Sequence, residues 1–138
     1  MKKLIKLKFA GNGLLALLTL SALFHSLVLV GLIPYSLVWG GRIDGPERMQ
    51  FLETVSLLLN LFMLVIVLLR MDYMKVRIHP KFITLILWLM FALFLVNTIG
   101  NLLSQNNFEK MFFSPLTLLL CLFSLRLAIE STIIEASN

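Results

Sequence analysis

Ionisable side chains inside long apolar runs are the residues of this chain whose chemistry most needs an explanation. Arg126 lies within the apolar run 116–129, and Glu130 follows it by one helical turn. His25 and Glu53 lie inside two earlier apolar runs. A charged group in hydrocarbon is costly, so such a residue usually pairs with another group, faces a cavity or carries function.

Acid–base chemistry on a lipid head group is one role that these residue types allow. Trp39, Arg42, Asp44 and Glu53 follow one another at the junction of the first two apolar runs, and paired acids beside a base suit proton transfer. The same residues also suit a capped, solvated loop. Motifs typical of phosphate-binding loops, serine hydrolases, zinc proteases and dinucleotide sites are absent from the sequence. We therefore expect a protein that is not an enzyme, with a lipid-active membrane enzyme as an alternative.

The histidines and the cysteine do not form a metal-binding pattern. His25 lies in an apolar run, His79 precedes a proline in a basic loop, and Cys121 is the single cysteine. A metal site needs several ligands close together, and a disulfide within the chain needs two cysteines. We predict no metal and no cofactor.

Composition identifies the class of protein. The 138 residues are 59% hydrophobic and 14% charged, which leaves too little polar surface for a water-soluble chain of this size. The net charge of +5 comes from basic residues between the apolar runs. This pattern is typical of membrane anchoring rather than of nucleic-acid binding.

The hydrophobic pattern predicts one all-α domain over residues 1–138, a four-transmembrane-helix bundle. The expected spans are about 13–38, 45–70, 81–103 and 114–134. Asp44, followed by Pro46 and Glu47, predicts a helix cap before the second span. Ser114 and Pro115 predict a cap and a first helical residue for the fourth.

Basic residues predict the orientation of the spans. Four lysines lie in the first twelve residues and four basic residues in 70–81, against two in 39–48 and one in 104–113. The positive-inside rule therefore places both termini in the cytoplasm. The first apolar run resembles a signal peptide, but it is too long for one, so we expect a retained span. Composition and span count are typical of a small bacterial inner-membrane protein.

Polar residues gather on particular faces of the expected helices at ~100° per residue. In the predicted orientation these faces lie in the outer half of the bundle, where they could line a vestibule open to the outside. Its candidate lining residues are His25, Trp39, Arg42, Glu53, Ser56, Asn60, Asn97 and Asn101. The alternative is that the same residues form hydrogen bonds between packed helices.

The fourth span has two distinct faces. A stripe of small residues from Thr117 to Ser131 predicts the side that packs against the other helices. Arg126 lies on the opposite side, so we expect it to face lipid or another subunit with Glu130 as its i, i+4 partner. One interpretation is an arginine that extends toward the head groups, and the other is an interface for an oligomer or partner.

Three functions are consistent with these patterns. The first is a small, non-enzymatic membrane protein that binds membrane lipids or a membrane-protein partner. The second is an oligomeric transporter or channel for a small solute or ion, which uses the outer vestibule. The third is the lipid-active enzyme described above. The sequence favours the first because of the missing catalytic motifs and the charged face of the fourth span.

Overall fold

Four long helices make up most of the chain in a computed structural model that describes residues 5–34, 45–76 and 78–136. They are α1 (Leu7–Leu29), α2 (Pro46–Arg70), α3 (Pro80–Leu103) and α4 (Ser114–Ala136), and a π-helical turn, η3 (Glu109–Phe113), leads into α4. Each of the four long helices is long and apolar enough to cross a membrane. The predicted all-helical chain with four candidate spans is confirmed.

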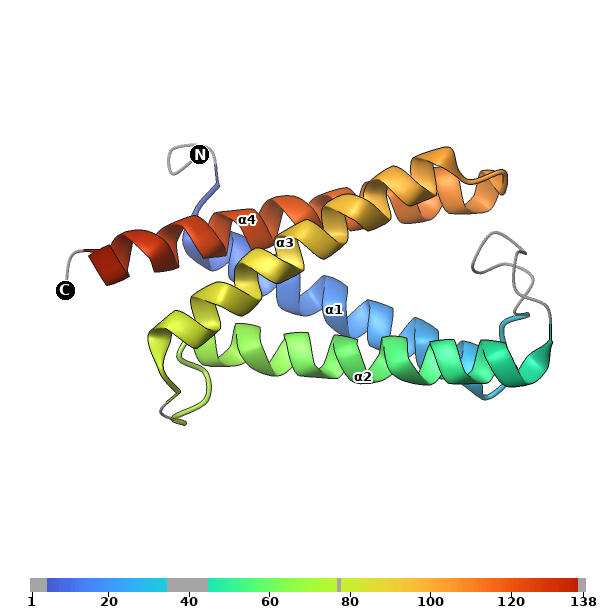
Figure 1. Cartoon of the computed structure of the whole chain (residues 1–138), viewed down its shortest axis with the longest axis horizontal. Helices are drawn as coiled ribbons and strands as arrows, with labels where there is room; N and C mark the ends of the chain where they lie inside the picture. The colour runs from blue at the N-terminus through green and yellow to red at the C-terminus, as the bar shows by residue number, and fades with distance from the viewer. Residues whose placement is uncertain (1–4, 35–44, 77, 137–138) are drawn as a thin grey trace.

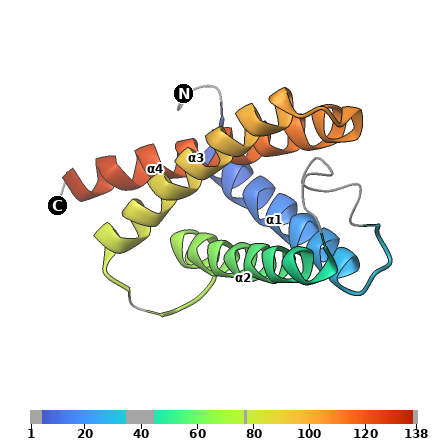
Figure 2. The same cartoon turned by 45° about the vertical axis from the view of Figure 1, so that its right-hand side comes forward.

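The helices form two antiparallel hairpins that meet in one half of the molecule and diverge in the other (Figure 1, Figure 2). α1 packs along α2 and crosses α4, while α3 runs beside α4. The 71–79 connection joins α2 to α3 and therefore links the two hairpins. α1 begins and α4 ends on the same side of the molecule (Figure 1).

The apolar core fills the half of the bundle where the hairpins meet. Its buried side chains come from the first half of α1, the second half of α2 and the middle of α3 and α4. Leu14, Leu18, Val67, Leu87 and Leu127 are all fully buried, so every helix contributes to one cluster. Close packing of this kind holds helices together in a bilayer, where the surrounding lipid is as apolar as the side chains.

Large apolar side chains also cover the outer surface. Leu58 of α2, Leu85 of α3 and Leu118 of α4 are 61%, 55% and 45% exposed. Water-soluble monomers rarely expose apolar surface of this extent, whereas a bundle in a bilayer is surrounded by acyl chains. The outer surface therefore fits the membrane class that the composition predicts.

Polar contacts join the helix ends on the side where α1 begins. Tyr73, just after α2, donates its hydroxyl proton to Asn12 Oδ1 of α1 at 2.8 Å. Arg70, the last residue of α2, donates from Nε to the Ser131 hydroxyl of α4. These bonds join α2 and the residues after it to α1 and to α4, at the end of the bundle where α1 begins.

α1 begins and ends earlier than the predicted span 13–38. It starts at Leu7, and it has already ended at Leu29 because Gly31 adopts a φ of 77°. The backbone N–H groups of Gly31 and Leu32 bond back to carbonyls of the last turn at 3.0 Å each, which is the pattern of a Schellman cap. The predicted end at residue 38 lies outside the described residues.

α2 and α3 begin within one residue of their predicted starts. The N-cap of α2 is Gly45, with Pro46 as the first helical residue, so the predicted cap at Asp44 was one residue early. Asp44 itself lies outside the described residues. α3 begins at Pro80, and the imidazole of His79 accepts from the backbone N–H of Lys81 at 3.3 Å.

The helix that contains α4 begins before the predicted cap at Ser114. Asn107 and Phe108 are already helical, and the π-helical turn of η3 follows them. Pro115 has no N–H and removes one bond of the i→i−4 ladder, a common cause of local distortion in a helix. Ser114 is therefore a buried interior residue, and the prediction that it caps the helix was wrong.

Replacement of Gly31 by alanine tests the left-handed cap that ends α1. An alanine held in this conformation carries a penalty of about 1–2 kcal/mol. Gly31→Ala should therefore lower the free energy of unfolding in detergent micelles by a similar amount. Gly100→Ala is the matched control, because Gly100 lies inside α3 with open space where a Cβ would be added. It should be neutral or stabilising by up to about 1 kcal/mol. Equal destabilisation by the two changes would contradict this account.

Candidate functional site

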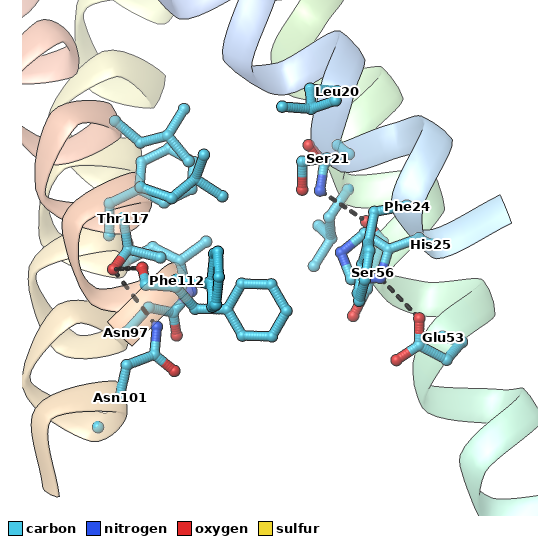
Figure 3. A pocket seen from close by; sticks show the side chains of 18 of the residues that line it. Leu20, Ser21, Phe24, His25, Glu53, Ser56, Asn97, Asn101, Phe112 and Thr117 are labelled. Atoms are coloured by element: carbon cyan, nitrogen blue, oxygen red, sulfur yellow. Dashed lines mark hydrogen bonds and ion pairs between the residues drawn. The ribbon is translucent and has the colours of Figure 1, made fainter. Parts of the chain in front are cut away.

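The two hairpins enclose a cavity of about 810 Å³ in the half of the bundle where they diverge. Residues from all four long helices line it, and six of the eight predicted vestibule residues are among them. These six are His25, Glu53, Ser56, Asn60, Asn97 and Asn101, and all except Asn60 are labelled in Figure 3. Trp39 and Arg42 lie outside the described residues. The polar faces that the sequence indicated thus meet at one cavity, and their role in binding stays a prediction.

An acid–imidazole pair forms the polar part of the wall that α1 and α2 contribute. His25 Nδ1 lies 2.6 Å from Glu53 Oε2, and the side chains are 19% and 1% exposed (Figure 3). A buried carboxylate needs such a partner because burial without hydrogen bonds is costly. Both residues were predicted from the sequence to line the vestibule, and the predicted span 13–38 would put His25 near its middle. It lies one turn from the end of α1, at a depth where it reaches Glu53.

A neutral hydroxyl–amide cluster forms the facing wall, between α3 and α4. The hydroxyl oxygen of Thr117 lies 3.0 Å from that of Thr98. It accepts from Asn101 Nδ2 at 3.4 Å (Figure 3). Thr117 donates its own proton to the Phe113 carbonyl one turn earlier at 2.8 Å. The predicted alternative, in which polar residues bond between helices, therefore holds for Asn101. Asn97 also lines this wall and is exposed.

Asn60 presents a hydrogen-bond acceptor without a partner. Its Nδ2 donates a long bond of 3.4 Å to the Ser56 carbonyl, whereas its Oδ1 is buried and makes no hydrogen bond. A buried acceptor left in this state costs about 1–3 kcal/mol. This oxygen has almost no accessible surface, so it faces protein atoms rather than the open space of the cavity.

Aromatic rings occupy the space between the two walls. Phe112 is 57% exposed and lies between His25 and the Asn101 wall (Figure 3). Phe108 packs against Phe112 at 4.7 Å between ring centroids, and Phe113 meets Phe24 of α1 edge-on at 5.2 Å. All four phenylalanines line the cavity, three of them from η3 and the residue before it. This cluster was not predicted from the sequence, in which no pattern distinguishes these rings from rings that face lipid.

Glu53 also borders a second hollow, of about 580 Å³. This hollow lies between the last turn of α1, the 31–34 segment and the first turns of α2. Glu53 therefore lies between the two cavities, with its side chain only 1% exposed. His25 lines the cavity of about 810 Å³ but not the second hollow.

Arg126 lies inside the bundle rather than on its outer face. The small-residue stripe of α4 is buried as predicted, but Arg126 is also only 4% exposed. Its Nε donates to the Ile5 carbonyl at 2.9 Å, and its Nη1 pairs with Glu130 Oε2 at 3.0 Å. The i, i+4 pair is confirmed, and the outward orientation was wrong because the segment before α1 covers this side of α4. A role for the pair in binding a partner stays a prediction.

The site combines an acid–imidazole pair, hydroxyl and amide groups and aromatic rings in an apolar setting. Among the described residues, no group of three or more His, Cys, Asp or Glu side chains could hold a metal ion. Comparison with protein families, curated proteins and solved structures finds no match to this chain.

A double-mutant cycle on the acid–imidazole pair measures its coupling. His25→Ala leaves the Glu53 carboxylate without its imidazole and should lower the unfolding free energy by about 1–3 kcal/mol. In a Glu53→Gln background the same change should cost less, since the charge is gone. Chemical unfolding in micelles should give a coupling of at least about 0.5 kcal/mol. Additive effects would show that the two side chains do not interact.

Removal of the Arg126 guanidinium should loosen the segment before α1. Arg126→Ala deletes the donor to the Ile5 carbonyl, a charged hydrogen bond whose loss corresponds to about tenfold or more in local opening. Amide hydrogen exchange of residues 5–10 should accelerate by that factor, while exchange in α3 stays unchanged. Lys75→Ala, on an exposed residue of the 71–79 connection, is the control and should leave both regions unaffected. Unchanged exchange at residues 5–10 would contradict the contact.

Proposed function

We propose that this chain is a small integral membrane protein that binds an amphipathic lipid between its two hairpins without catalysing a reaction. The observation that carries the proposal is the cavity, with apolar and aromatic walls and a few convergent polar groups. Its volume of about 810 Å³ lies within the range of about 300–1,000 Å³ that is usual for small-molecule sites. An acyl chain would fill the apolar space while the polar end meets the acid–imidazole pair.

Exposure of the lining residues supports entry from the bilayer. Leu23 of α1, Leu59 of α2 and Val96 of α3 line the cavity and are 56%, 46% and 65% exposed. The cavity is therefore open to the surroundings of the bundle between the diverging hairpins. In a membrane these surroundings are lipid, so a lipid can enter sideways without crossing water.

The orientation proposed for the protein has both termini in the cytoplasm of a bacterial inner membrane. Lys6, Lys8, Arg70 and Lys81 support it, because they lie at the helix ends on the side where α1 begins. Basic residues at one end favour the cytoplasmic leaflet, whose anionic lipids attract them. The cavity then opens in the outer half of the bilayer.

Oligomeric transport of a small solute or ion is the second candidate function. The observation that favours it is the position of Glu53 between the cavity and the second hollow. The apolar core fills the opposite half of the bundle, so a route across the membrane requires a second copy or another membrane protein. The side of α4 near Glu130 is the proposed contact for such a partner.

Filling of the cavity should remove bound lipid. Ser56→Trp places a large ring into the cavity from α2, so the purified protein should retain at least about tenfold less lipid, a loss of ~1.4 kcal/mol in binding. Leu58→Trp is the control, because Leu58 lies on the same helix, points outward and does not line the cavity. Native mass spectrometry of both variants from the same membranes provides the measurement. Equal lipid retention by the two variants, or none by the native chain, would contradict the proposal.

A further inference from the structure

We infer that the molecule bound between the hairpins is an uncharged lipid whose polar end is a hydroxyl or ester group. This inference rests on the proposed function, since it assigns the chemistry of the lipid that the cavity binds. It depends on three observations: the lack of accessible charge in the cavity lining, the polar side chains that keep hydrogen-bond capacity there, and the depth of these side chains along the helices.

The wall of the cavity presents little charge to a bound molecule. Its described lining contains no lysine or arginine, so an anionic head group would meet no opposite charge. Its one carboxylate, Glu53, is 1% exposed and pairs with His25, so a cationic head group would meet a carboxylate that is covered and paired. Either charged group would lose its hydration without compensation, which is costly in an apolar setting. The lining therefore favours a molecule without charge.

Asn97 of α3 provides an accessible amide on one wall. It lines the cavity and is exposed, and none of the described residues forms a hydrogen bond with its side chain. Gly100, one turn later, also lines the cavity, and no atom lies within 4 Å of the position that a Cβ would take there. Open space therefore adjoins the amide, which can donate to an ester carbonyl and can both donate to and accept from a hydroxyl.

Hydroxyl groups and an imidazole nitrogen provide similar capacity on the facing wall. Ser21 of α1 and Ser56 of α2 are half-buried lining residues whose hydroxyls make no hydrogen bond within the described part of the chain (Figure 3). The His25 ring meets Glu53 through Nδ1, which leaves Nε2 to accept in the neutral ring or to donate in the imidazolium. A hydroxyl both donates and accepts, so it can pair with each of these groups in either protonation state. A quaternary ammonium can do neither.

These polar groups lie deep along the helices that flank the cavity. Ser56 follows Pro46, the start of α2, by ten residues, or ~15 Å, and Asn97 precedes Leu103, the end of α3, by six residues, or ~9 Å. The hydrocarbon core of a bilayer is ~30 Å thick, so ~15 Å from its boundary is its middle. A charged head group would have to leave the interface to reach this depth. A hydroxyl or ester needs only one or two hydrogen bonds, which the walls offer.

Three lipids with one acyl chain and different polar ends test the inference. Monooleoylglycerol, oleoyl lysophosphatidic acid and oleoylcholine share the oleoyl ester and are neutral, negative and positive. The protein is equilibrated with equal amounts of the three in nonionic micelles, and native mass spectrometry measures which lipid it retains. Retention that Ser56→Trp abolishes is assigned to the cavity. This retention should be at least about tenfold greater for monooleoylglycerol than for either charged lipid, equivalent to ~1.4 kcal/mol.

Matched variants locate the polar end of the lipid. Asn97→Leu removes the exposed amide and should weaken retention of monooleoylglycerol about fivefold, equivalent to ~1 kcal/mol. Asn107→Leu is the control, because Asn107 is also exposed but does not line the cavity, and it should leave retention unchanged. Ser56→Ala removes a hydroxyl from the facing wall and should weaken retention about threefold. Retention that neither Asn97→Leu nor Ser56→Ala lowers would overturn the assignment.

The outcomes of the lipid comparison distinguish this inference from the proposed function. Cavity-dependent retention of the phosphate or choline lipid that equals or exceeds that of monooleoylglycerol would refute the uncharged polar end, while the lipid-binding proposal stands. Absence of cavity-dependent retention for all three lipids would refute both. Selective retention of monooleoylglycerol that Asn97→Leu lowers and Asn107→Leu does not would support both.

Discussion

A carboxylate buried among apolar helices needs a partner, and this requirement shapes the first hairpin. Glu53 is 1% exposed, and the imidazole that meets it comes from α1, a different helix. The pair forms because α1 and α2 are antiparallel and because α1 ends soon after His25, which sets both side chains at one depth. The Gly31 cap, the acid–imidazole pair and the wall of the cavity are therefore parts of one arrangement.

The bundle divides its two tasks between its two halves. Leucine, valine and alanine side chains fill the half where the basic residues lie, and polar contacts such as Tyr73–Asn12 close that end. The other half holds the polar and aromatic residues, together with the cavity that the diverging hairpins leave between them. Most residues of the cavity lie outside the apolar core, although Met63, Phe94 and Leu120 belong to both.

Helical periodicity was sufficient to predict which polar residues would meet, since Ser56, Asn60, Asn97 and Asn101 all line one cavity. It did not predict the link between His25 and Glu53, because a span drawn to residue 38 placed His25 too deep. The signal for the true end was Gly31, a residue that tolerates the left-handed backbone.

Arg126 was misplaced because periodicity within one helix says nothing about a distant segment that covers it. The phenylalanines near η3 were missed because an apolar ring that faces a cavity has the same sequence signature as one that faces lipid.

Because the two hairpins pack together in one half and diverge in the other, a small rotation at the packed half moves the distant helix ends much further. The helix ends beside the cavity lie beyond the core by up to 17 residues, or ~25 Å at 1.5 Å per residue, which is the separation of Pro46 and Met63 along α2. A relative rotation of ~5° at the core would move those ends by ~2 Å, which is enough to change the width of the cavity substantially while core side chains shift by fractions of an ångström. The width of the cavity opening therefore depends on small rotations of the two hairpins at the distant core.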